Sequence, residues 1–270
     1  MDGADPDRWS AVAADWLDLW GGLAAPLWQV IAEAAGVGPG TKVVDVGCGS
    51  GDLLAYVDAL GASTAGMDPA PGMVDFARAQ IPRADVRLGS AERLPWPDDA
   101  FDLATSVNAV QFAEDAHDAL LELARVTKPG GLVAVANWAQ PELNDLDTIE
   151  EAVAHAADLN PIPAGDLRHP GGLETLFTGC DLDIVVAGVV DTPWSVPDDD
   201  TLVRAVLLGE DPSTVKAKAA TVIRAARPFR TPSGGYRLSN SFRYAIGTYS
   251  PPRVLPTMLP PARGRAEGDV

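Results

Sequence analysis

Between residues 41 and 138 the sequence alternates short apolar runs with helical segments, and this rhythm limits the possible folds more than any other feature. The apolar runs are KVVDVG, STAGMD, ADVRLGS, FDLATSVNAVQ and LVAVANW. Between them, segments such as GDLLAYVDALG and PGMVDFARAQIP have the character of helices. Strands that alternate with helices at this spacing form parallel β-α-β units. We therefore predict an α/β fold with a doubly wound, mostly parallel sheet and helices on both faces.

Further segments complete the predicted sheet and add to it. LDIVVAGVV indicates a sixth strand and GYRLSNSFRYAIGTY a last one, which brings the sheet to seven. Helical additions are expected over residues 9–35, 141–160 and 198–227. The first of these is expected to break at Gly21 and Gly22.

A single domain is predicted over residues 1–250. We expect a helical lid over 1–35, a ligand-binding core over 41–138, and substrate-side insertions with the last strands over 139–250. Residues 251–270 are rich in Pro and Gly, which predicts a flexible tail.

The acidic composition restricts the partners of the chain. Its net charge is −18 and its pI is near 4.3. Such a surface repels phosphates, so neither nucleic acid nor an anionic membrane is expected as a partner. The N-terminus lacks a signal-peptide pattern, and no apolar run reaches the roughly 18 residues of a membrane span, so a cytoplasmic protein is expected. Cys48 and Cys180 lie far apart and form no metal-binding motif, so no metal is expected.

The turn after the first apolar run carries the most specific chemical signal. In VVDVGCGSGDL, Val43 to Leu53, three glycines let the backbone approach a ligand without a Cβ in the way. In an open α/β sheet this turn lies at the carboxyl ends of the strands, where ligands bind. A dinucleotide fingerprint would need a third small residue at position 52. The chain has Asp52 there, an acid that would face the pyrophosphate, so NAD and FAD are disfavoured.

Two acids at strand ends indicate a different ligand. Asp45 lies at the end of the first run and could face a positive group. Asp68 ends the second run, where an acid can accept both hydroxyls of a ribose. The loop contains no basic residue for a phosphate. A nucleoside with a positive charge and no phosphate meets these conditions, and S-adenosyl-L-methionine (SAM) is such a molecule.

Four blocks of sequence resemble the class I SAM-dependent methyltransferases, specifically their small-molecule subgroup. The blocks are VVDVGCGSG, AGMDPAPGMVDFAR, RLGSAERLPWPDDAFDLATSVNAVQF and LARVTKPGGLVAVANW, in the order that the family has them. The resemblance implies a Rossmann-like fold. It also implies SAM as the cofactor and S-adenosyl-L-homocysteine (SAH) as the product.

The resemblance further implies roles for residues of the first two blocks. The loop Gly47–Gly51 would lie under the methionine part of SAM. Asp45 would bind the amino group, directly or through water, and Asp68 would hold the ribose hydroxyls. Pro69 and Met73 would border the adenine.

The third block departs from the family at one position. Ser90 stands where the family usually has an acid for the adenine amino group, although the Ala91 amide could still reach the ring. Glu92 could be a ligand contact or a capping carboxylate. The segment 108–111 would face the methyl group and the substrate. The full set of expected cofactor-binding residues is Asp45, Gly47, Cys48, Gly49, Gly51, Asp68, Pro69, Met73, Ser90, Ala91, Glu92, Asn108 and Gln111.

Histidines are the first candidates for a general base. His117 begins the helix after the fourth apolar run, and His169 lies in the loop DLRHPGG, so both are candidate catalytic residues. Tyr236 and Tyr244 are weaker options. Each histidine could equally be a solvated surface residue, and a mechanism without a base is also consistent with the sequence.

Two biased segments have two interpretations each. The four tryptophans within residues 9–28 could pack the N-terminal helices onto the body of the protein, or form an aromatic lid over a ligand. The segment from Pro212 to Arg253 contains basic residues and no acid. It could dock on the acidic remainder, or Arg237 or Arg243 could bind a substrate carboxylate or phosphate.

Together these features predict a SAM-dependent methyltransferase that acts on a mid-sized, partly apolar metabolite, as a tailoring enzyme of secondary metabolism. O- or N-methylation is favoured over C-methylation, and the protein is expected to be a monomer or a homodimer. Three alternatives stay open: a SAM-binding enzyme of the same fold with other chemistry, such as a cyclase or decarboxylase, a non-catalytic SAM-binding partner protein, and an NAD-dependent enzyme, which Asp52 argues against.

Overall fold

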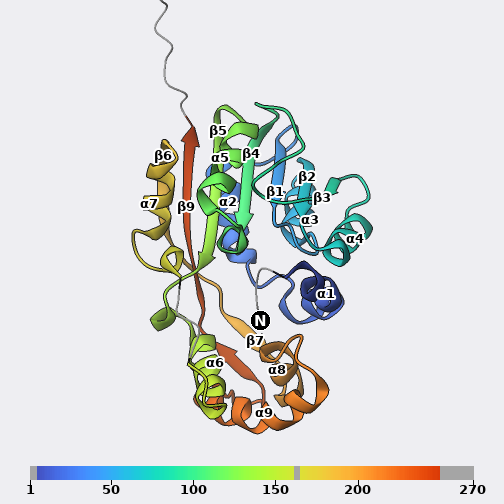
Figure 1. Cartoon of the computed structure of the whole chain (residues 1–270), viewed down its shortest axis with the longest axis vertical. Coiled ribbons are helices and arrows are strands. Elements are labelled where there is room, and N and C mark those ends of the chain that lie inside the picture. The colour runs from blue at the N-terminus through green and yellow to red at the C-terminus, as the bar shows by residue number, and fades with distance from the viewer. Residues whose placement is uncertain (1–4, 161–164, 250–270) are drawn as a thin grey trace, which may run out of the picture.

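A seven-stranded sheet forms the centre of the protein in a computed structural model that describes residues 5–160 and 165–249 (Figure 1). Its strand order is β3-β2-β1-β4-β5-β9-β6, and all strands run parallel except β9, which is antiparallel to both of its neighbours. The strands are β1 (Lys42–Val46), β2 (Ser63–Asp68), β3 (Asp85–Leu88), β4 (Phe101–Val107), β5 (Thr127–Trp138), β6 (Leu182–Asp191) and β9 (Ser241–Tyr249). The predicted doubly wound, mostly parallel sheet is confirmed.

Helices cover both faces of the sheet because neighbouring residues of its central strands point to opposite sides. From β1, Val43 packs with residues of α2 (Ala25–Ala35) and α3 (Asp52–Ala59) in one core. Val44 packs on the other face with residues of α5 (Ala116–Val126) and α7 (Gly172–Gly179). The helix α4 (Pro71–Gln80) shares a third, smaller core with α3. Near-continuous apolar strands such as β1 are typical of a sheet buried on both faces.

A smaller lobe lies beyond one end of the sheet (Figure 1, lower part). It contains α6 (Asp145–Ala156), α8 (Asp199–Val206), α9 (Pro212–Ala225) and a two-stranded sheet of β7 (Trp194–Val196) and β8 (Tyr236–Leu238). Its core also includes Leu19 from the first helix, with Trp20 and Trp138 packed against it. We propose on this basis that the lobe and the sheet form one domain. The predicted tail over 251–270 lies outside the described residues.

The last predicted strand is wrong in one respect, because GYRLSNSFRYAIGTY forms two strands in two different sheets. The chain changes sheets at Asn240, between β8 and β9. The Asn240 carbonyl accepts a hydrogen bond from the Thr192 amide at 2.7 Å, and its side chain accepts one from the Leu146 amide at 3.2 Å. These contacts hold the crossing point between the lobe and the sheet. Neither β7 nor its pairing with β8 was predicted.

The N-terminal helix α1 (Pro6–Trp20) lies between the sheet and the lobe (Figure 1). It packs against α4, where the Gly72 amide donates to the Ser10 hydroxyl at 3.1 Å. A Cβ on Gly72 would lie 2.6 Å from the Ser10 carbonyl oxygen, so only glycine permits this approach. On its other side, Asp15 accepts from Arg204 of α8 at 3.1 Å. The predicted break after α1 is confirmed: α2 starts only at Ala25.

The helices were compared with the dimensions of a membrane span. Within residues 5–160 and 165–249, no helix combines the length and the apolar character that crossing a bilayer would require.

Candidate active site

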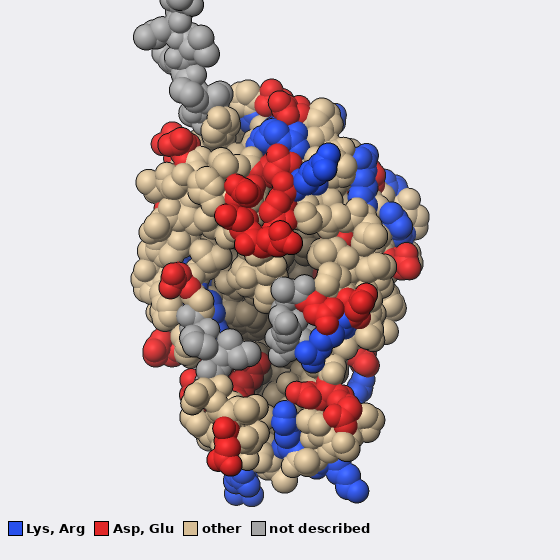
Figure 2. Space-filling view, in the orientation of Figure 1, with Lys and Arg blue, Asp and Glu red and all other residues tan. Residues whose placement is uncertain are grey.

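A cavity of about 390 Å³ opens at the end of the sheet that faces α1 and the lobe. Its walls include the carboxyl ends of β2, β1, β4 and β5 and the first residues of the antiparallel β9. Figure 2 shows that the molecule is hollowed between the sheet body and the lobe, and that acidic side chains gather above the hollow. Ligands of open α/β sheets bind at this edge of the sheet.

The glycine-rich turn after β1 is held open by hydrogen bonds to the end of β2. The amides of Gly47 and Cys48 both donate to the Met67 carbonyl, at 2.7 and 3.0 Å. The Gly49 amide donates to the Asp68 carboxylate at 2.9 Å. A Cβ on Gly49, which has φ of 53°, would meet no atom within 4 Å, so this residue leaves open space on the cavity side.

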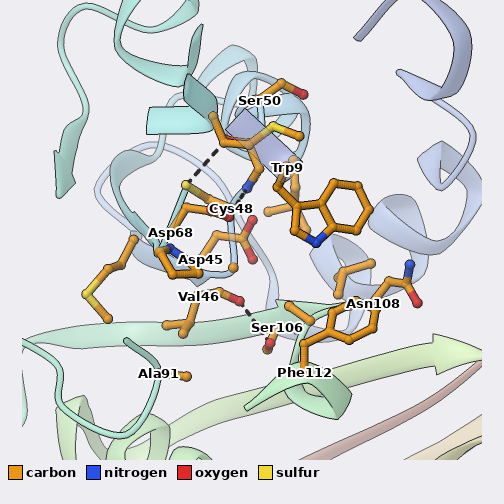
Figure 3. Close-up of a pocket in the computed structure, with 18 of the residues that line it drawn as sticks. Trp9, Asp45, Val46, Cys48, Ser50, Asp68, Ala91, Ser106, Asn108 and Phe112 are labelled. Atoms are coloured by element: carbon orange, nitrogen blue, oxygen red, sulfur yellow. Dashed lines mark hydrogen bonds between the residues drawn. The ribbon is translucent and has the colours of Figure 1, made fainter. Parts of the chain in front are cut away.

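Asp68 and Asp45 lie together at the polar end of the cavity (Figure 3). Asp68 also accepts from the Ala70 amide at 2.9 Å, so its carboxylate fixes the start of α4 as well as the loop. Burial raises the pKa of Asp68, and the amides of Ala70 and Gly49 oppose the rise. Burial raises the pKa of Asp45 to about 7, against a hydrogen bond from the Thr105 hydroxyl and with a further rise from the Asp68 charge. A cationic ligand group would relieve both acids.

Cys48 and Met73 line the same end of the cavity. Burial, together with the charges of Asp68 and Asp45, raises the pKa of the Cys48 thiol well above its usual range. The thiol therefore stays protonated at neutral pH, which disfavours it as a nucleophile. Met73 is buried between α1 and α4, and Pro69 also lines the cavity.

The loop after β3 contributes Ser90, Ala91 and Glu92 to the cavity wall. Glu92 accepts from the Glu114 amide at 2.6 Å. Burial alone would raise the pKa of Glu92, but hydrogen bonds from its own amide, the Ser90 hydroxyl and the Glu114 amide outweigh this and lower it. Glu92 thus stays ionised and ties two loops together, whereas Asp115 caps the helix that follows, and Glu92 lies two residues from the departure at Ser90.

The end of β4 places Asn108 in the cavity wall, with φ of 54°. Its amide donates to the Ala136 carbonyl of β5 at 2.7 Å, and its side chain accepts from Gln111 at 2.9 Å. Gln111 itself does not line the cavity, so it acts on the site by orienting Asn108. Phe112, the next residue, does line it.

Tryptophans close the remaining side of the cavity. Figure 3 shows the ring of Trp9 above Phe112 and Asn108, across the cavity from Asp68. The N-terminal tryptophans both pack onto the body and line the cavity, which agrees with an aromatic lid. The aromatic residues in the wall are Trp9, Trp16, Trp20, Trp28, Phe112, Trp138 and Phe242.

Besides Gln111, three of the predicted site residues lie outside the cavity wall. Gly51 caps α3 from outside the cavity, and a Cβ there would meet Ala77 of α4 at 3.1 Å. His117 is exposed on α5, and its Nε2 lies 3.0 Å from the Gly179 carbonyl oxygen. His169 follows the short 3-10 helix Asp166–Arg168 at the surface. Both histidines are absent from the cavity wall, so the structure gives no support to either as a general base.

The described basic residues of the segment from Pro212 to Arg253 do not line the cavity. Arg243 is buried on β9, where it donates to the Arg168 carbonyl at 3.3 Å and to the Gln140 side chain at 2.7 Å. Arg237 points outward from β8. Arg230 pairs with Asp199 at 2.8 Å, which agrees with docking on nearby acids. Neither Arg237 nor Arg243 reaches the cavity as a substrate-binding residue.

The side chains present fit a nucleoside with a positive charge. Among the described residues, the cavity wall contains no Lys, Arg or His, so a phosphate would find no counter-charge. The two buried acids, Asp45 and Asp68, suit an ammonium group and ribose hydroxyls, and Gly49 leaves room beside them. The fold and the site therefore define an α/β protein built to bind SAM rather than a dinucleotide.

Comparison with known proteins identifies the family. A family model described as a methyltransferase domain matches residues 44–135, which contain the glycine loop and both acids. Residues 44–135 therefore form a methyltransferase domain of the class I SAM-dependent type, with SAM as the cofactor.

Individual relatives share part of their length with the chain. A malonyl-[acyl-carrier protein] O-methyltransferase of Yersinia pestis is 36% identical over 126 residues, which are 46% of this chain and 47% of the relative. A demethylmenaquinone methyltransferase of Renibacterium salmoninarum is 29% identical over 176 residues, 62% of this chain and 72% of the relative. The chain spans 43% of the length of the first relatives and 47% of that of the Yersinia pestis protein, but 72% of that of the Renibacterium salmoninarum protein.

Solved structures agree with the fold. A SAM-dependent methyltransferase from Thiobacillus denitrificans, in complex with SAH, has a TM-score of 0.55 and is 20% identical, covering 83% of this chain and 90% of that one.

Proposed function

We propose that the protein transfers the methyl group of SAM to an oxygen or nitrogen atom, less favourably a carbon atom, of a mid-sized and largely apolar metabolite. One observation carries this proposal: a single cavity has buried acids for the cofactor at one end and aromatic rings at the other. Cofactor and acceptor would then share one enclosed space. A role in secondary metabolism, as a monomer or a homodimer, belongs to the same proposal.

The residues of the cavity bind the cofactor, orient the two reactants and exclude water. When bound, SAM supplies a methyl group that its sulfonium has already activated. Asp45 and Asp68 hold the polar parts of the cofactor, and the glycine loop lets the backbone approach it. Asn108, fixed by Gln111, offers an amide to a polar group of the acceptor. Trp9 and Phe112 cover the site against water.

A site of this kind needs no general base among its described residues. Alignment of two reactants can supply roughly 7–11 kcal/mol of a barrier on its own. Glu92 is tied to the loop of Glu114 by its hydrogen bond and lies beside Ser90, on the adenine side that the family implies. We therefore assign no base, and propose that the methylated product releases its proton to solvent as it leaves the cavity.

The relatives support methyl transfer but differ in what their names say they act on. O-methylation of a malonyl group takes place on a carboxylate, which needs a cationic partner in a buried site. The cavity wall has none among the described residues. The demethylmenaquinone methyltransferase is named for an acceptor without a carboxylate. An acceptor of that kind fits this cavity wall better than a malonyl group does.

Calorimetric titration with SAM, SAH and NAD tests the proposal, followed by mass spectrometry for an acceptor that gains one methyl group. Both adenosyl ligands should bind, and NAD should not. The variant Asp68→Ala should weaken adenosyl binding, and Asp75→Ala, at an exposed acid of α4, should leave it unchanged. If the protein bound neither SAM nor SAH, the proposal would be refuted.

A further inference from the structure

We infer that the methyl acceptor is an uncharged, planar aromatic molecule that binds against one wall of the cavity. This inference rests on the proposed function and specifies its substrate class. The wall, called the aromatic wall from here on, consists of Trp16, Trp20, Trp138 and Phe242.

The sheet holds two members of the aromatic wall, Trp138 and Phe242, apart from the cofactor acids. Asp68 ends β2 and Asp45 lies on β1, whereas Trp138 ends β5 and Phe242 begins β9. The strand order β2-β1-β4-β5-β9 puts β4 between the two groups. Since neighbouring strands lie about 4.8 Å apart, the distance from β1 to β9 is on the order of 14 Å. A cofactor over β1 and β2 therefore leaves the space over β5 and β9 for the acceptor, with Asn108 of the β4 end between them.

The rings of the aromatic wall support one another. Trp138 and Phe242 are cross-strand partners, and their rings stack with centroids 4.5 Å apart. Trp20 meets Trp138 edge to face at 6.5 Å and stacks with Trp16 at 5.9 Å. Trp194 of the lobe stacks on Trp20 at 4.4 Å.

This mutual packing makes the wall a rigid surface before any ligand binds. Trp16, Trp20 and Trp138 are nevertheless only partly buried, and each lines the cavity. Indoles held in place with exposed apolar surface favour a flat aromatic partner, because stacking adds to the burial of apolar area without a new ordering of side chains.

The charges of the cavity exclude an anionic acceptor. Its wall has five acids and, among the described residues, no basic side chain: the acids are Asp45, Asp52, Asp68, Glu92 and Glu114. An acceptor with a carboxylate or phosphate would be buried without a counter-charge and repelled by these acids. A cationic acceptor is disfavoured for another reason, because the cofactor beside it already carries a sulfonium and an ammonium. An uncharged acceptor avoids both penalties.

Four probes of similar size separate these properties. The protein is first saturated with sinefungin, an unreactive SAM analogue that carries an amine cation where SAM has its sulfonium, and then titrated with 2-naphthol, 2-naphthoate, 2-naphthylmethylammonium or the saturated 2-decalol. Calorimetry gives the affinity, and quenching of tryptophan fluorescence reports contact with indoles. 2-Naphthol should bind most tightly, with the saturated probe roughly 2–10-fold weaker, the range that a ring pair worth about 0.5–1.5 kcal/mol implies. Both charged probes should bind at least about 10-fold more weakly.

Variants tie the preference to the aromatic wall. Trp138→Leu should weaken 2-naphthol binding by roughly 2–10-fold and leave SAH binding unchanged, while Trp138→Phe keeps a ring and should restore most of the affinity. Trp96→Phe is the control, because Trp96 packs against Phe101 away from the cavity. It should change neither affinity.

The outcomes are distinct. Absence of SAH binding would overturn the proposed function and this inference with it. If SAH binds normally, three results would overturn the inference and leave the proposed function intact. They are equal affinities for 2-decalol and 2-naphthol, a higher affinity for a charged probe than for 2-naphthol, and an unchanged 2-naphthol affinity in Trp138→Leu.

Discussion

The contact between Gly47 and Ala109 allows a sharp test of how the glycine loop is built. A Cβ on Gly47 would lie 2.2 Å from the Cβ of Ala109, and the residue has φ of 74°. A residue with a Cβ in the left-handed backbone conformation costs roughly 1–2 kcal/mol of stability, and overpacking costs roughly 1–3 kcal/mol. Gly47→Ala should therefore lower the free energy of unfolding by about 2–5 kcal/mol.

Two matched variants separate the clash from the backbone strain. Ala109→Gly in the Gly47→Ala background removes the opposing Cβ, so it should recover the overpacking part, roughly 1–3 kcal/mol. Gly49→Ala also imposes a positive φ, of 53°, but its Cβ meets no atom within 4 Å. It should cost only the strain, roughly 1–2 kcal/mol, while its methyl group enters the cavity and weakens SAH binding.

Urea denaturation of the four proteins and of Ala109→Gly alone completes a double-mutant cycle. SAH calorimetry on the folded variants gives the second readout. The reasoning is refuted if Gly47→Ala unfolds at the wild-type urea concentration, or if Ala109→Gly restores nothing in its background. Unchanged SAH binding by Gly49→Ala would show that the open side of the loop does not face the cofactor.

Three further variants test other parts of the site. Burial raises the pKa of Asp45 from 3.8 to about 7, so the unfolded chain ionises first and stability should fall as pH rises between these values. Denaturation across this window should show a shallower fall in Asp45→Asn, because burial also raises the pKa values of Asp68 and Glu150. Asp68→Ala should weaken SAH binding by roughly 1–3 kcal/mol in calorimetry, and also lower stability because Gly49 loses its acceptor. Gly72→Ala should lose roughly 1–3 kcal/mol and speed hydrogen exchange in α1, because its Cβ meets the Ser10 carbonyl.

The sequence predicts best what local chemistry decides. The run before Asp45 and the glycines after it determine a strand and a turn with few alternatives, and the same edge rule places Asp68 beside them. That rule also reaches Trp138, which ends the fifth apolar run, although it was not among the expected site residues. Its signal was present: an aromatic residue at the carboxyl end of a central strand.

Other features depend on contacts that sequence patterns do not encode. Phe242 lies at the cavity only because β9 runs antiparallel to its neighbours. The sequence GYRLSNSFRYAIGTY contains no signal that predicts this strand direction or the crossing between sheets at Asn240. The orientation of His117 also depends on such a contact. His117 lies on the helix after β4, near the cavity end of the sheet, but its side chain points toward the Gly179 carbonyl and away from the cavity.

The backbone of Asn108 connects these arguments. A residue other than glycine with φ of 54° is strained, and such strain persists only where the surroundings impose it. Here the Ala136 carbonyl holds its amide and Gln111 holds its side chain. Because β4 lies between the acids of β1 and the aromatic wall of β5 and β9, the strained turn places this side chain at the boundary between cofactor and acceptor. A relaxed extended residue there would continue the strand and carry the side chain away from that boundary.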